Sequence, residues 1–218
     1  MISSDTEVSS IRSRPVLCAD LLHRIHGLNC DYLELLASEA AGIEPTGQGR
    51  YLALKARLLV PQLSREQRAR LAAVPYALYS LRFDDVRFWR RLGSSSPLPL
   101  SERYTPGVRS LETAFCETAL IQAWHIASTQ PLAARLLYGM SEAVSTALAA
   151  APLWQLKWLA RHDAEILMPR WATNPCFWPD LIELALRGDE ARLATAQLLG
   201  VQLTAAEFLE AGRRKSAA

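Results

Sequence analysis

The sequence predicts an all-α protein in which one long N-terminal helix and a set of short helices form a multi-helix bundle. Apolar residues recur at helical spacing, and helix capping signals recur along the chain. There is no βαβ alternation and no repeat of fixed period. Half of the 218 residues are hydrophobic and 21% are charged, which is ordinary for a globular protein.

The N-terminal region is predicted to hold a polar tail and two helices. Residues 1–14 are small, polar and without periodicity, so we expect a disordered tail. The first helix is expected over residues 16–41, because apolar side chains there follow one helical face. Residues 42–49 form a loop by their glycine and proline content, and a second helix follows over residues 50–60 until Pro61 ends it.

The next segment carries two helix starts with an ambiguous run between them. Ser64 and Gln67 have the spacing of a capping box, which predicts a third helix beginning at Ser64. The apolar run 76–83 is compatible with either a strand or a helix. Asp84 or Asp85 can then cap another helix that reaches Leu92.

A stretch rich in glycine, serine and proline over residues 93–109 predicts a linker. It divides residues 15–92, a helical region whose apolar stripe offers a place to dimerise, from residues 110–218, a bundle of short helices. Helix starts are predicted at Ser110, Pro131 and Pro152, after Asn174-Pro175 with an end at Gly188, at Asp189 with an end at Gly200, and at Thr204 with Glu207 as its capping partner.

The residue patterns give no support for an active site or a bound metal. His23, His26 and Cys30 share a helical face, but a closed zinc site needs a fourth ligand, and histidines beside an apolar stripe are usually polar rim residues. The segment 139–143 lacks the last glycine of a nucleophile elbow. We therefore expect a protein that is not an enzyme and has no cofactor, and an enzyme with dispersed catalytic residues is the less favoured alternative.

Cellular location and tryptophan content add two expectations. No apolar run approaches the roughly 18 to 20 residues of a membrane span, and the first residues lack the pattern of a signal peptide, so we expect a cytoplasmic protein. Five of the six tryptophans fall in the second half. They are expected to be packing residues, although a tryptophan-rich partner groove is the alternative.

Positive charge is concentrated between Arg50 and Arg91. This stretch contains ten basic and three acidic residues, whereas the net charge of the whole chain is only +2. This segment is either a solvated face or a nucleic-acid surface that meets phosphates. The candidate nucleic-acid-binding residues are Arg65, Arg68, Arg70, Arg82, Arg87, Arg90 and Arg91.

Within the first 91 residues the sequence resembles FlhD, a subunit of the bacterial flagellar transcriptional activator. The matching residues are Leu21-Leu22, Ile25, Asn29, Tyr32-Leu33 and Leu35, and then Leu63-Ser64-Arg65-Glu66-Gln67, Leu71-Ala72, Leu78 and Arg82-Phe83-Asp84. The resemblance implies an all-helical dimer that acts in transcription control, with residues 64–91 near DNA or a partner activator subunit. Residues 110–218 have no counterpart in that family.

These observations combine into one leading hypothesis and one alternative. The leading hypothesis is a bacterial, non-enzymatic regulator that binds DNA through the seven arginines and forms a homodimer. Its dimer interface would be the stripe of Leu21, Ile25, Leu28, Tyr32 and Leu35. The alternative is an all-α adaptor or scaffold, for instance in a secretion or motility assembly, that binds a protein partner through its tryptophan-rich C-terminal half.

Overall fold

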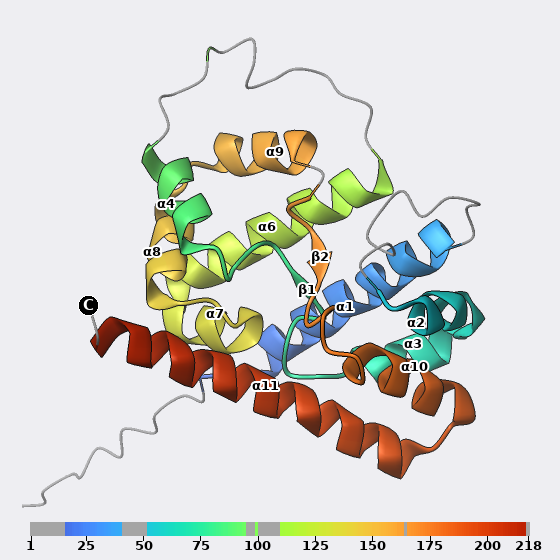
Figure 1. Ribbon diagram of the computed structural model, residues 1–218. Coiled ribbons are helices and arrows are strands. Elements are labelled where there is room, and N and C mark those ends of the chain that lie inside the picture. The colour runs from blue at the N-terminus through green and yellow to red at the C-terminus, as the bar shows by residue number, and fades with distance from the viewer. Residues whose placement is uncertain (1–15, 41–51, 95–98, 100–109, 164, 217–218) are drawn as a thin grey trace, which may run out of the picture.

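A computed structural model describes residues 16–40, 52–94, 99, 110–163 and 165–216, and within these residues the protein is all-α, as predicted (Figure 1). The tail 1–14, the loop 42–49 and most of the linker 93–109 lie outside the described residues. The helices are α1 (Ala19–Ala40), α2 (Leu54–Leu59), the 3₁₀ turn η2 (Val60–Gln62), α3 (Arg65–Ala72), α4 (Val86–Ser94), α6 (Leu111–Thr129), α7 (Pro131–Tyr138), α8 (Glu142–Ala150), α9 (Leu153–His162), α10 (Phe177–Arg187) and α11 (Glu190–Ser216), and two short strands, β1 (Tyr79–Ser80) and β2 (Met168–Pro169), pair in antiparallel fashion.

Most of the predicted helix starts are confirmed. The Ser64 hydroxyl accepts a hydrogen bond from the Gln67 amide at 3.2 Å, and the Ser64 amide donates to the Gln67 side chain at 2.8 Å, which completes the capping box. The Ser110 hydroxyl accepts from the Thr113 amide at 3.0 Å and so caps α6, and Pro131 occupies the first turn of α7. These starts are predictable because capping bonds join residues only three apart in the sequence.

The apolar stripe of α1 has a different role from the one predicted. Leu21, Ile25, Leu28, Tyr32 and Leu35 are only 0 to 7% exposed in the single chain, because α2, α3, η2 and α6 pack around this helix. The stripe is therefore part of the intramolecular core, and it leaves little surface that a second copy could cover. The correction has a simple cause, since an apolar helix face looks the same in sequence whether it meets its own chain or another.

The C-terminal end of the fold also differs from the expectation. One helix, α11, runs through Gly200, and Thr204 is not a cap, because its hydroxyl donates inside the helix to the Gly200 carbonyl at 2.9 Å. A Cβ on Gly200 would lie 2.2 Å from the ring of Tyr76. This glycine thus permits close packing of α11 against Tyr76 and does not end a helix.

Two segments of the chain repeat the same local structure, although the sequence analysis detected no repeat. An interval of 89 residues separates Arg82 from Trp171 and Phe88-Trp89 from Phe177-Trp178. Arg82 and Trp171 share a left-handed backbone, with φ of 55° and 54°. In both segments, the indole of the Phe-Trp pair donates to a backbone carbonyl earlier in the chain: Trp89 to Arg82, seven residues before it, and Trp178 to Arg170, eight residues before it.

The helix that follows each of these segments packs on the other half of the chain. The antiparallel pair of β1 and β2 joins the halves, α4 of the first half packs on α8 of the second, and α10 of the second half packs on α3 of the first (Figure 1). This reciprocal packing is that expected of two similar units related by a local two-fold axis. One continuous core therefore runs through both predicted regions, 15–92 and 110–218.

Candidate functional site

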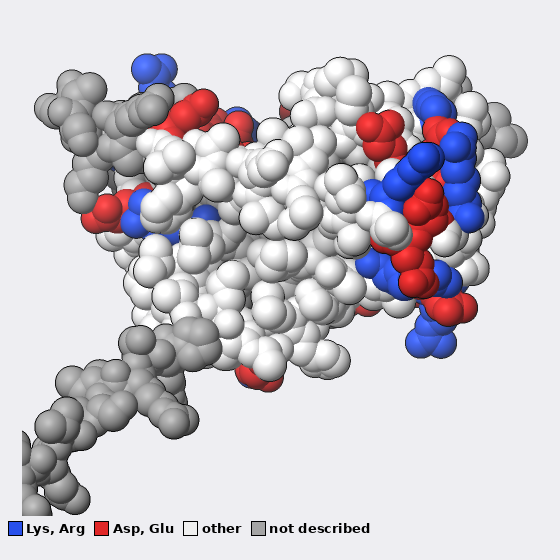
Figure 2. All heavy atoms as spheres, turned by 90° about the horizontal axis from the view of Figure 1, so that it is seen from below, with Lys and Arg blue, Asp and Glu red and all other residues white. Residues whose placement is uncertain are grey.

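The seven predicted nucleic-acid-binding arginines do not share one surface. Arg65, Arg68 and Arg70 lie on α3, beside α10 at one end of the molecule. Arg87, Arg90 and Arg91 lie on α4, beside α8 at the opposite end (Figure 1). At the α3 end, basic and acidic side chains are interleaved (Figure 2).

Two of these arginines are held by acidic neighbours. Arg70 pairs with Glu66 at 3.2 Å and with Glu190 at 3.0 Å. Arg82 pairs with Asp85 at 3.0 Å, and its guanidinium lies 4.5 Å from the centre of the Phe88 ring. Both side chains therefore take part in contacts within the fold, and Arg87, Arg90 and Arg91 form a separate, exposed basic group on α4.

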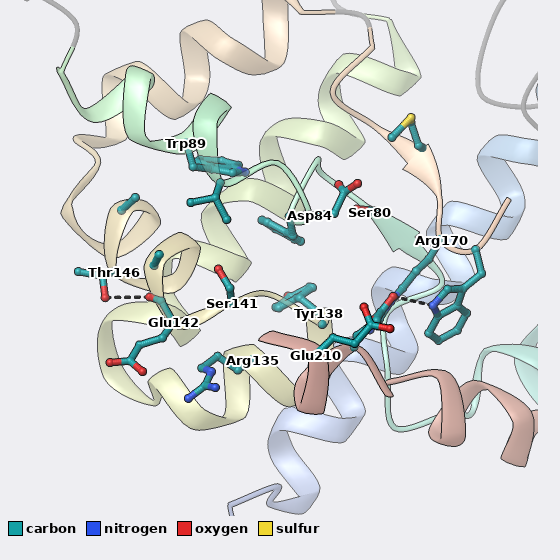
Figure 3. A pocket seen from close by; sticks show the side chains of 18 of the residues that line it. Ser80, Asp84, Trp89, Arg135, Tyr138, Ser141, Glu142, Thr146, Arg170 and Glu210 are labelled. Atoms are coloured by element: carbon teal, nitrogen blue, oxygen red, sulfur yellow. Dashed lines mark hydrogen bonds and ion pairs between the residues drawn. The ribbon is translucent and has the colours of Figure 1, made fainter. Parts of the chain in front are cut away.

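A cavity of about 1080 Å³ lies where α4, α7, α8, α11 and the segment after β2 meet (Figure 3). It draws its walls from both halves of the chain. Its lining residues are Ser80, Phe83, Asp84, Val86, Trp89, Arg90, Arg135, Tyr138, Gly139, Ser141, Glu142, Ala143, Thr146, Ala147, Ala150, Met168, Pro169, Arg170, Trp171, Ala172, Thr173, Glu207 and Glu210.

One wall of the cavity is an ion pair that binds α11 to the rest of the fold. Arg170 is 3% exposed, and it donates to Glu207 at 2.5 Å and to the Leu137 carbonyl at 2.9 Å. The second carboxylate oxygen of Glu207 accepts from the Trp171 indole at 2.7 Å. Burial lowers the pKa of Arg170, whereas Glu207 raises it, and an arginine so paired stays charged.

Backbone geometry at this wall is restricted. Gly139 ends α7 with φ of 69°, and a Cβ there would come within 2.2 Å of Glu207 and 2.3 Å of Arg170. Trp171, a bulky residue, also has a positive φ. A left-handed backbone at such a residue costs on the order of 1 to 3 kcal/mol, so the surrounding bonds must hold it.

The other walls of the cavity are mainly apolar. Trp89 and Tyr138 are buried at its edge, and the small side chains of α8 leave the space between them open. Burial raises the pKa of Tyr138, so its hydroxyl stays protonated at neutral pH. The Ser141 hydroxyl accepts from the Val144 amide at 3.2 Å as the cap of α8. Ser141 therefore caps α8, a helix start that the sequence analysis did not predict.

The remaining candidates from the sequence have ordinary surroundings. His23, His26 and Cys30 lie along α1, and the described residues hold no group of three or more His, Cys, Asp or Glu side chains arranged to bind a metal. Trp89 and Trp178 are 1% exposed and are packing residues, as expected. Within the described part of the chain, no helix is both long and apolar enough to cross a membrane.

Comparison of the chain with family models, with curated proteins and with solved structures found no match. The resemblance to FlhD thus rests on the matching residues alone.

Sequence reasoning did not identify the cavity. Its residues come from four separate stretches of the chain, 80–90, 135–150, 168–173 and 207–210, and nothing in the sequence places Arg170 opposite Glu207. One signal was present: the Phe-Trp pair at residues 88–89 recurs at residues 177–178. That interval could have indicated that the two halves share a local structure.

Proposed function

We propose that the protein is a non-enzymatic regulator or adaptor that holds an amphipathic helical segment of a partner protein in the cavity between α4, α8 and α11. The observation that carries this proposal is the cavity itself, which is built by both halves of the chain and has about 1080 Å³ of open space. The proposal keeps the non-enzymatic regulatory role expected from the sequence and moves the binding site away from the seven arginines.

The composition of the cavity suits such a segment. Val86, Met168 and Trp171 offer partly exposed apolar surface, and the alanines of α8 make room for a partner's side chains. Arg90, Glu142 and Glu210 contribute charges of both signs. Helical peptides that bind in grooves use this combination, in which apolar anchors give affinity and charged groups give register. The volume slightly exceeds that of typical small-molecule pockets, about 300 to 1,000 Å³.

A selection experiment tests this function. A phage-displayed library of helical peptides is selected on the wild-type protein and then measured on Ala147→Trp, whose indole would fill the cavity. We expect the enriched peptides to carry apolar residues at i, i+3 or i+4, and i+7. They should lose at least tenfold in affinity on Ala147→Trp, because the apolar anchors no longer fit.

Ala69→Trp is the matched control, because Ala69 is exposed on α3, away from the cavity. It should bind the same peptides as the wild-type protein does. The proposal is wrong if no peptide is enriched, or if the enriched peptides bind Ala147→Trp as tightly as the wild type.

DNA binding is a second candidate, and α4 is the observation that favours it. Arg87, Arg90 and Arg91 are exposed within one short helix, inside the stretch that resembles FlhD. Three arginines on two turns of helix could meet neighbouring phosphates of one strand.

Titration of a fluorescent DNA duplex at several salt concentrations tests this second function. We expect the triple variant of Arg87, Arg90 and Arg91 to alanine to bind more weakly. The slope of log affinity against log salt should fall by roughly one unit for each phosphate contact removed. The control replaces Arg65 and Arg70 of α3 with alanine and should change neither quantity. Equal effects of the two variants, or binding that ignores salt, would exclude a DNA site on α4.

A further inference from the structure

The outer face of α11 is apolar and exposed. Leu198 is 59% exposed and Leu209 is 63% exposed, and Val201 lies beside this line at 40%. Residues 193–206 contain no charged side chain. Seen from the side on which α11 lies, the middle of the molecule is largely uncharged, while most of the charges gather toward its two ends (Figure 2).

The outward residues follow a coiled-coil spacing. Positions 191, 195, 198, 202, 205 and 209 alternate steps of four and three residues, and all six are exposed. They hold Ala, Thr, Leu, Gln, Ala and Leu in that order. A helix face with this spacing forms a seam that can pack against a second helix along about 27 Å, at 1.5 Å per residue.

This seam is complementary to itself when it runs in the opposite direction. In an antiparallel pair centred on Gly200, Leu198 faces Gln202 of the second copy, and Thr195 faces Ala205. At both ends, the large Leu209 meets the small Ala191. Each leucine of the seam thus meets a small or flexible side chain of the second copy, so this single surface can pack against itself about a two-fold axis.

Charged residues lie at both ends of this uncharged run. Arg192, 74% exposed, pairs with Asp189 at 3.4 Å before the run, and Glu207 and Glu210 follow it. In an antiparallel pair, each arginine lies near the end of the second copy that carries these glutamates.

We propose that two copies of the protein form a homodimer through α11 packed antiparallel on α11. This interface differs from the predicted α1 stripe, which is buried inside each chain. It does not depend on the proposed function. One helix pair covers less than the roughly 800 Å² per partner of a standard interface, so we expect a dimer with a dissociation constant in the micromolar range.

Sedimentation equilibrium of the full chain tests this interface. The wild-type protein should change from monomer to dimer as its concentration rises from about 1 µM to several hundred µM. Leu198→Glu should stay monomeric over the whole range, since it places a charge at the centre of the seam. Leu54→Glu is the matched control, because Leu54 on α2 is 66% exposed, and it should dimerise like the wild type.

Disulfide trapping tests the direction of the helices. In a Cys176→Ser background, which removes the exposed native thiol, Leu198→Cys chains are mixed with Gln202→Cys chains and oxidised. Antiparallel pairing predicts that mixed 198–202 crosslinks exceed the 198–198 and 202–202 products, as read by mass spectrometry. A wild type that is monomeric at all concentrations, a dimer that survives Leu198→Glu, or an excess of like-with-like crosslinks would overturn the proposal.

Discussion

Arg170 shows how one buried charge can organise the wall of a cavity. Its guanidinium joins Glu207 of α11 to the carbonyl of Leu137 in α7. The same group lies over the Trp171 ring, with the guanidinium carbon 4.3 Å from the ring centre. A buried ion pair contributes little net stability when complete, but breaking it is costly because one charge is left without a partner. The shape of the cavity therefore depends on a few atoms that no local sequence pattern could indicate.

Gly139 provides a direct test of that dependence. Gly139→Ala should lower the free energy of unfolding by about 2 to 4 kcal/mol more than Gly188→Ala, because the new methyl group would displace the Arg170–Glu207 pair. Both glycines have the same left-handed backbone, with φ of 69° and 70°, but a Cβ on Gly188 would meet nothing within 4 Å. Both variants therefore share the backbone strain, on the order of 1 to 2 kcal/mol.

Urea unfolding followed by tryptophan fluorescence measures the difference between the two variants. If Gly139→Ala and Gly188→Ala lose equal stability, then the close packing of Gly139 against the ion pair is not a constraint on the fold.

Single elements were predictable where their ends depend on local bonds. Ser64 and Ser110 each accept a hydrogen bond from an amide three residues later, and their helices begin where predicted. Ser141 makes the same bond, but the start of α8 was not predicted. The predicted helix end at Gly200 is wrong, because this glycine is required for close packing against Tyr76, which is distant in sequence. The apolar run 76–83 could not be assigned to strand or helix from the sequence, because β1 forms by pairing with β2, which is also distant in sequence.

At the scale of the whole molecule, the fold class could be predicted and the arrangement could not. Periodicity and caps indicate helices, but they do not say that α4 and α10 exchange places between two halves. The repeat escaped detection because α9 has no counterpart between Pro75 and β1, so the spacing inside the two halves differs. Few residues beyond the Phe-Trp pairs are shared between them. Nor does the sequence say that the apolar α1 stripe packs within its own chain.

The exchanged packing predicts that the two halves unfold together. Leu71 of α3 and Leu148 of α8 are equivalent positions, each four residues before a proline, and both are fully buried. Leu71→Ala and Leu148→Ala should each lower the free energy of unfolding by about 2 to 5 kcal/mol. Each should also shift one common transition, because α3 packs on α10 and α8 packs on α4, so neither half keeps its core when the other is lost.

The measurement compares circular dichroism and tryptophan fluorescence across a urea titration of the full chain. Coincident curves in the wild type and in both variants are expected from one shared core. The exposed substitution Leu132→Ala is the control and should shift the midpoint little, since Leu132 is 44% exposed on α7. Two independent domains would behave differently: each core variant would then shift only one of two transitions and leave the other unchanged. That result would contradict a core built jointly by both halves.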